Sequence, residues 1–167
     1  MDNILTAILG DIECVYGPCA PRTYSELERR YRRQPYLQLV QELERHFQVA
    51  DTTDLNCDVA LHLGINDTTG GRWLLALSLV GKYALFWRFP YDQSAGRLIV
   101  ETCRNLSMSE WYILDLLPQH GLIALDQETL ATPIAISLPE IAIEDVHVYQ
   151  LLFYQLEGFP WDVQSTE

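Results

Sequence analysis

Apolar residues in the N-terminal third of the chain recur at the spacing of amphipathic helices. One helix is predicted over residues 3–15, where apolar side chains share a face and Gly17 follows as a stop signal. Thr23 and Glu26 stand at the spacing of a capping box, which predicts a second helix over 24–33. After Pro35, five apolar residues form a third helical stripe: Tyr36, Leu39, Val40, Leu43 and Phe47.

The central part of the chain has the period of β-strands, because apolar residues alternate with others from residue 59 onward. Strands are predicted over residues 59–65, 73–80, 83–89 and 98–103. The segments between them are short and rich in turn-forming residues, with Gly70 and Gly71 in one and Gly81 in the next. Consecutive strands joined in this way pair side by side, so we expect an antiparallel meander of about four strands.

The C-terminal third is predicted to return to helices. Ser107 and Glu110 form a second capping box, which opens a helix with Trp111 and Leu114 facing inward and Pro118 at its end. Residues 122–138 are irregular, with a short strand at each end. Residues 143–156 are apolar nearly all round and predict a last helix, although alternation over 146–149 leaves a strand open there. The pattern predicts an α+β fold in one domain, 1–162, with a flexible tail, 163–167.

Composition supports a folded domain that needs no membrane. The chain has 167 residues, of which 49% are hydrophobic and 20% charged, as in packed globular proteins. No stretch approaches the roughly 20 apolar residues of a membrane-spanning helix, and Asp2 stands where a secretory signal would carry a basic residue. We therefore expect a cytoplasmic protein. Its four cysteines are few and unevenly spread, which favours reduced thiols over a disulfide framework.

Charge is unevenly distributed along the chain, whose net charge is −12. All 11 Lys and Arg residues lie at or before Arg104, and everything after it is free of both. That basic-free third carries these carboxylates: Glu110, Asp115, Asp126, Glu128, Glu140, Glu144, Asp145, Glu157, Asp162 and Glu167. Two interpretations are open. The early arginines could pair with these acids inside the fold, or unpaired acids could form a negative surface that attracts a basic partner and repels nucleic acid.

No sequence motif assigns a reaction. The glycines form neither a phosphate-binding loop nor a dinucleotide fingerprint, and the His and Cys spacings fit no zinc site, so no cofactor, metal or catalytic residue is predicted. Four polar residues interrupt the successive predicted strands and could share one sheet face: His62, Ser78, Arg88 and Glu101. A polar sheet face is usually the solvated one. The alternative is a small enzyme or a ligand-binding domain that uses this face.

Aromatic residues near the C-terminus lie among acids and supply the leading functional hypothesis. The candidate partner-binding residues are Glu144, Asp145, Tyr149, Phe153, Glu157, Trp161 and Asp162. Burial in the core is the commoner fate of such aromatics. Where they are exposed, aromatic anchors rimmed by acids make a protein-binding patch. We therefore predict a non-enzymatic binding protein, an inhibitor, adaptor or immunity-type protein for a basic protein partner. Self-association into a homo-oligomer through the same aromatics is a third interpretation.

Overall fold

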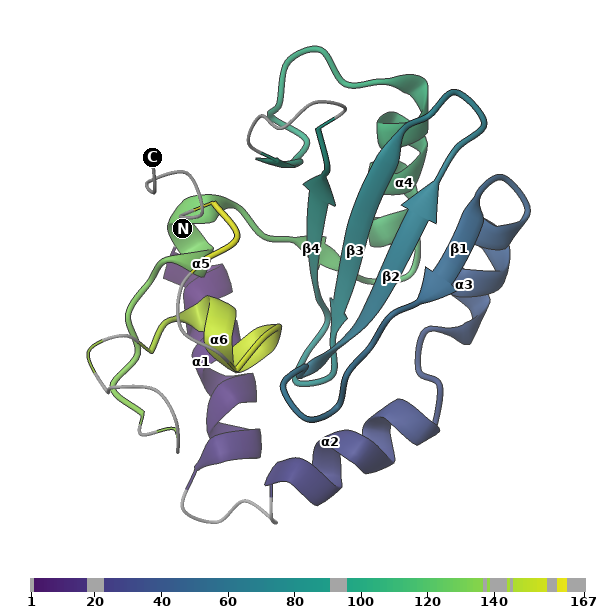
Figure 1. Cartoon of the computed structure of the whole chain (residues 1–167). Helices are drawn as coiled ribbons and strands as arrows, with labels where there is room; N and C mark the ends of the chain where they lie inside the picture. Colours follow the sequence, from purple (N-terminus) through teal and green to yellow (C-terminus); the bar gives the residue numbers. More distant parts are fainter. Residues whose placement is uncertain are drawn as a thin grey trace, which may run out of the picture.

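The chain has the predicted α+β architecture, in which N-terminal helices are followed by a mostly antiparallel sheet and then by C-terminal helices (Figure 1). The computed structural model describes residues 2–17, 23–90, 96–136, 138, 144, 146–155 and 159–161. The predicted tail, 163–167, lies outside these residues. None of the helices within the described ranges is long and apolar enough to cross a membrane.

The three predicted N-terminal helices are all present: α1 (Asp2–Tyr16), α2 (Thr23–Arg32) and α3 (Leu37–Glu44). The side chain of Thr23 lies outside the described part, and the Glu26 carboxylate binds Arg29 and Arg30 one turn further along α2. Between α2 and α3, Gln34 has a φ of 49°. Residues that precede a proline avoid the α-helical region, so Gln34 ends α2 and turns the chain before Pro35.

The sheet contains the predicted meander. β2 (Ala60–Asn66), β3 (Arg72–Ser78), β4 (Tyr83–Arg88) and the short β5 (Arg97–Leu98) pair antiparallel in sequence order. One strand was not predicted: β1 (Gln48–Asp51), which forms the edge beside β2. The short strand expected at the start of 122–138 is β6 (Ile123–Ala124), which pairs parallel with the start of β4. β1 was missed because Phe47 prolongs the helical stripe of α3 up to the first residue of the strand.

The C-terminal third contains α4 (Met108–Gln119), α5 (Gln127–Leu130) and α6 (Val148–Leu152). The predicted capping box of α4 is confirmed, because the Ser107 hydroxyl accepts from the Glu110 amide at 3.2 Å and the Glu110 carboxylate accepts from the Ser107 amide at 2.7 Å. α6 is much shorter than the helix expected over 143–156. Just before it, His147 forms an antiparallel bridge with Pro133, the extended alternative that the sequence left open.

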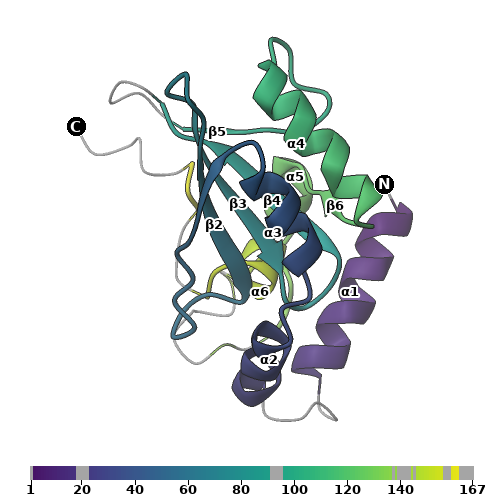
Figure 2. The ribbon, with the colours of Figure 1, turned by 90° about the vertical axis from the view of Figure 1, so that its right-hand side faces the viewer.

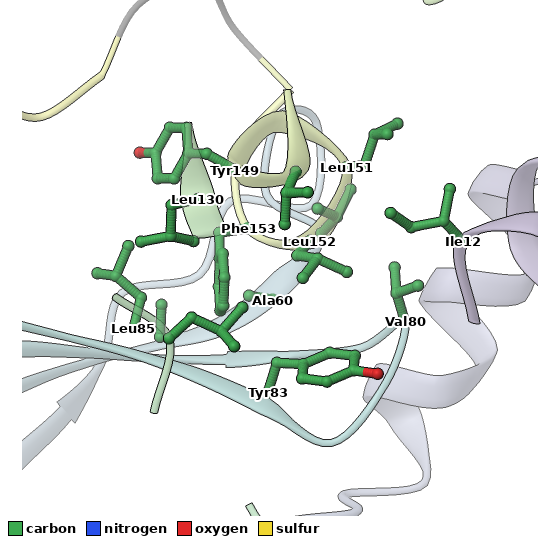
Figure 3. Packing of buried hydrophobic residues seen from close by; sticks show 14 of the residues in the cluster. Ile12, Ala60, Val80, Tyr83, Leu85, Leu130, Tyr149, Leu151, Leu152 and Phe153 are labelled. Atoms are coloured by element: carbon green, nitrogen blue, oxygen red, sulfur yellow. The ribbon is translucent and has the colours of Figure 1, made fainter. Parts of the chain in front are cut away.

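Each face of the sheet is covered by its own hydrophobic core. One core joins the sheet to α1, α2, α5 and α6, and Figure 3 shows Phe153, Leu152 and Leu130 packed over Ala60 and Leu85. The other core joins the opposite face to α3 and α4, which lie on the same side of the sheet in Figure 2. α4 is thus held by its inner face alone, and its outer face remains available to solvent.

Candidate functional site

The four polar residues expected on one sheet face are dispersed. Ser78 pairs with Ala60, two residues before His62 on β2, so Ser78 and His62 face α1 and α6. Arg88 pairs with Trp73 and faces α4. Glu101 lies in an exposed turn beyond β5. The expectation of a shared polar face was therefore wrong, because the four-residue connection from β3 to β4 pairs even-numbered with odd-numbered positions.

His62 and Ser78 are interior residues. The Nδ1 atom of His62 lies 3.4 Å from a carboxylate oxygen of Asp58, and its ring stacks on Tyr154 with 6.3 Å between centroids. Burial lowers the pKa of His62, and the nearby Asp58 charge only partly offsets this effect. Ser78 is fully buried and accepts a hydrogen bond from the Val80 amide at 3.1 Å. Both side chains serve packing and turn formation.

The C-terminal aromatics expected to bind a partner belong mainly to the core. Phe153 is 1% exposed and packs over the sheet in Figure 3, and Tyr149 is 9% exposed and lies beside Leu130 in the same hydrophobic core. Trp161 is half-buried and lies close to the Tyr149 ring, with 5.9 Å between centroids. Glu144 is exposed. The remaining predicted residues lie outside the described part of the chain: Asp145, Glu157 and Asp162.

The early arginines do not neutralise the basic-free third as a group. Arg29 and Arg30 bind Glu26, and Arg32 binds Glu28, all within α2. Among described residues, one ion pair connects an arginine with the acidic third, that between Arg88 and Glu110. Four other carboxylates of this third are exposed and have no ion pair with any described residue: Asp115, Asp126, Glu128 and Glu144. No described cation therefore neutralises these four acids, although Asp126 also caps α5 by accepting from the Thr129 amide at 2.8 Å and Asp115 accepts from the Gln119 side chain at 2.9 Å.

The outer face of α4 carries the most exposed large apolar side chains in the described part of the chain. Met108 is 85% exposed and Trp111 is 50% exposed. Asp115 follows Trp111 by one helical turn and is exposed as well. The prediction that Trp111 faces inward was wrong, since the inner face is supplied by Ile113, Leu114, Leu116 and Leu117. An exposed Trp beside an exposed Met is unusual for a solvated surface and typical of protein interfaces.

A cleft of about 330 Å³ borders α4 on the side of Leu114 and Pro118. Trp111 lies one helical turn before Leu114 and is not itself among the lining residues of the cleft. Acids line it at Glu101 and Asp126, and its described lining contains no Lys or Arg. Ile123, which is 47% exposed, adds apolar surface at the same place. We call these residues together the α4 surface: Met108, Trp111, Asp115, Glu101, Ile123 and Asp126.

Glu110 links the start of α4 to the sheet. Its fully buried carboxylate accepts from the Trp73 indole at 2.9 Å, from the Ser107 amide and from both arms of the Arg88 guanidinium. Burial alone would raise the pKa of Glu110, but the hydrogen bonds from Arg88, Ser107 and Trp73 outweigh burial and lower it. The neighbouring Trp111 is thereby presented on a preorganised helix, which reduces the entropy lost on binding.

Sequence reasoning missed Met108, Asp115 and Ile123, although one signal was present. On a helical wheel, the buried side of α4 is marked by Glu110, the last residue of the capping box, and by four apolar residues. Trp111 and Asp115 then fall on the opposite side. Glu101 was noticed as part of a sheet face and is instead part of the α4 surface.

The α4 surface can offer apolar contact and negative charge. Within the described residues, no group of three or more His, Cys, Asp or Glu side chains is placed to hold a metal ion. A comparison with protein-family models, with curated proteins and with solved structures found no match to this chain.

Proposed function

We propose that the protein is a non-enzymatic binding module, of the acidic inhibitor, adaptor or immunity type, and that its α4 surface binds a basic protein partner. One observation supports this most directly: Trp111 is half-exposed on α4, the helix that borders a cleft lined by Glu101 and Asp126 and by no described basic residue. The proposal keeps the class of partner expected from the sequence and relocates the contact from α6 to α4.

The two kinds of residue on this surface have different roles in binding. Trp111 and Met108 are the anchors, since Trp is enriched among the residues whose truncation costs an interface about 2 kcal/mol or more. The carboxylates of Asp115, Glu101 and Asp126 select a partner with a basic surface and speed its approach. A basic segment with an apolar side chain for the cleft is the complementary ligand.

The alternative of a ligand site on the sheet face has lost its geometric basis, because its four residues lie in three different places. Self-association remains a measurable alternative occupant of the α4 surface. A second copy would have to present positive charge to Glu101 and Asp126, and its assembly would be seen as a concentration-dependent mass.

The test is affinity capture with the tagged protein from native lysate at low and at raised salt, followed by mass spectrometry. We expect a basic protein that is retained at low salt by the wild type and lost from both Trp111→Ala and the double variant Asp115→Lys/Asp126→Lys. The matched controls alter exposed residues outside the α4 surface, Leu37→Ala and the double variant Glu44→Lys/Asp54→Lys. These controls should retain the partner.

A partner that the α4 variants and the controls retain equally would contradict the proposal. A further double variant, Glu144→Lys/Glu157→Lys, tests the contact first expected near α6. Loss of the partner from this variant, with retention by Trp111→Ala, would return the contact to that segment. An assembly of identical copies that Trp111→Ala dissolves would replace the proposal with self-association.

A further inference from the structure

A second cleft in the described structure has the opposite charge to the α4 surface. It measures about 1010 Å³ and lies where the connection from α2 to α3 meets the turn after β3 and the C-terminal end of α4. Its lining contains two arginines, a lysine and a histidine: Arg30, Arg33, Lys82 and His120. No carboxylate is among its described lining residues, although the chain has 23 Asp and Glu against 11 Lys and Arg. Such a separation of charge favours an anionic ligand.

The nitrogen-bearing side chains of this basic cleft differ in how far the fold already uses them. Arg30 is engaged, because it binds Glu26 and donates to the Leu79 and Val80 carbonyls, both at 2.9 Å. His120 lies 3.0 Å from a carboxylate oxygen of Glu42. Arg33 and Lys82 are exposed and form no ion pair with any described residue. These two cations are available to a ligand.

The wall of the basic cleft is fixed by hydrogen bonds before any ligand arrives. The Tyr36 hydroxyl donates to the Ser78 carbonyl and lies 3.3 Å from the Gly81 carbonyl, so it fastens the turn after β3. Burial raises the pKa of Tyr36 to about 12, although the charge of Arg30 opposes the shift. Tyr36 is therefore a hydrogen-bond donor at neutral pH. Gly81 has no room for a side chain, since a Cβ there would lie 2.4 Å from the Tyr83 ring.

We propose that the basic cleft binds a small organic phosphate, with Arg33 and Lys82 contacting the phosphate. Arginine and lysine are the side chains that bind phosphate in proteins, Arg through its planar fork and Lys as a point charge. The remaining lining gives a ligand body both apolar and amide contacts, from Leu37, which is 45% exposed, and from Gln34 and Gln38. The volume is at the upper end of ligand pockets, which reach about 1,000 Å³.

Titration calorimetry with three probes tests the proposal: ADP, inorganic pyrophosphate and citrate. We expect ADP and pyrophosphate to bind the wild type and to bind at least about tenfold more weakly to Arg33→Gln and to Lys82→Gln, as loss of a charge-assisted hydrogen bond implies. The control for the double variant Arg33→Gln/Lys82→Gln is Arg45→Gln/Arg104→Gln. It removes the same amount of positive charge from exposed sites outside the cleft and should bind like the wild type.

The probes also separate the sources of the phosphate. Tighter binding of ADP than of pyrophosphate identifies a phosphorylated molecule whose body contacts the cleft, and this is the expected result. Equal binding of the two would overturn the organic part and leave a site for free phosphate. If citrate bound as tightly as ADP, the cleft would be a site for carboxylates and not for phosphates. No heat from either phosphate probe at millimolar concentration, or equal weakening by the control, would overturn the proposal entirely.

One measurement tests whether Lys82 has only a structural role, because Lys82 lies close to Gly121 at the C-terminal end of α4. A cation there stabilises the negative end of the helix dipole. If Lys82 served only α4, Lys82→Gln would lower the free energy of unfolding and leave ADP binding unchanged. Urea denaturation of the same variants, without ligand, therefore accompanies the calorimetry.

Discussion

Replacement of Glu110 by glutamine should destabilise the fold by about 3 kcal/mol at neutral pH, although the two side chains have the same shape. The reason is that both carboxylate oxygens face donors. One oxygen receives Trp73 and one arm of Arg88, and the other receives the Ser107 amide and the second arm of Arg88. The amide nitrogen of glutamine, in either orientation, would be a donor that points at two other donors.

The magnitude follows from the number of contacts that change. Hydrogen bonds to a charged group contribute about 1.5–3 kcal/mol each and those to a neutral group about 1 kcal/mol, so Glu110→Gln weakens the retained contacts and opposes the others. Removal of one partner from a buried ion pair costs about 3–5 kcal/mol. We take the lower end because the Arg88 side chain is 31% exposed and water can solvate it.

The pH dependence of this difference in stability is a second, independent test of the role of Glu110. The pKa of Glu110 is lower in the folded protein than its ordinary value of 4.5. Its carboxylate therefore stabilises the fold fully above pH 4.5, and this contribution disappears as the pH falls through the lower folded-state pKa. The difference between wild type and Glu110→Gln should be largest at neutral pH and should shrink in acid.

Urea denaturation followed by circular dichroism measures this difference at pH 7 and at several lower values. The matched control is Glu128→Gln, which alters an exposed carboxylate of α5 and should change stability by less than about 0.5 kcal/mol. If Glu110→Gln fell within the same range as this control, or if its effect grew in acid, the assigned role of Glu110 as the anchor of α4 would be refuted.

Two further predictions test the assignment of core and surface. Phe153→Ala should lower the free energy of unfolding by about 3–5 kcal/mol. Trp111→Ala should change it by less than about 1 kcal/mol, because half of that side chain is already exposed. Equal losses of stability in urea denaturation would contradict both placements. In alkali, Tyr36 should ionise with a pKa of about 12. The buried Tyr16, Tyr83 and Tyr149 should also ionise at a higher pH than free tyrosine, because burial is the largest cause of each raised pKa. Their raised folded-state pKa values stabilise the fold fully below pH 10, and this contribution is lost as the pH rises through about 12 for Tyr36 and through still higher pH for the other three. Absorbance titration at the tyrosinate band checks this, and complete ionisation of all tyrosines near pH 10 while the protein remained folded would contradict it.

The parts of the fold with a clear hydrophobic period were predictable from the sequence. The stripe from Tyr36 to Leu43 identified α3, the alternation from Val59 onward identified the meander, and Ser107 with Glu110 identified the start of α4. The short strand at the start of 122–138 was expected and is β6, but the extent of α6 was not predictable, because α6 is held by contacts with distant segments. His147, for example, pairs with Pro133, and the period of 146–149 alone could not decide between helix and strand.

The candidate site was predictable only in its chemistry. Net charge and the absence of Lys and Arg after Arg104 pointed to an acidic surface, but composition does not say which aromatic is buried. Phe153 and Trp111 both lie in apolar helical segments. Their opposite fates follow from α6 being covered by α1 and α5, whereas α4 has one covered face. The basic cleft escaped notice because Arg33, Lys82 and His120 are far apart in sequence and meet only through the topology.

The most direct test of the central claim is the affinity of the captured basic partner for the wild type and for Trp111→Ala, measured by calorimetry at low salt. A loss of about 2 kcal/mol, or roughly 30-fold in Kd, is expected for an anchoring Trp, together with a steep weakening of wild-type binding as salt is raised. An affinity that changes by less than about twofold, and that ignores salt, would show that the α4 surface is not where the partner binds.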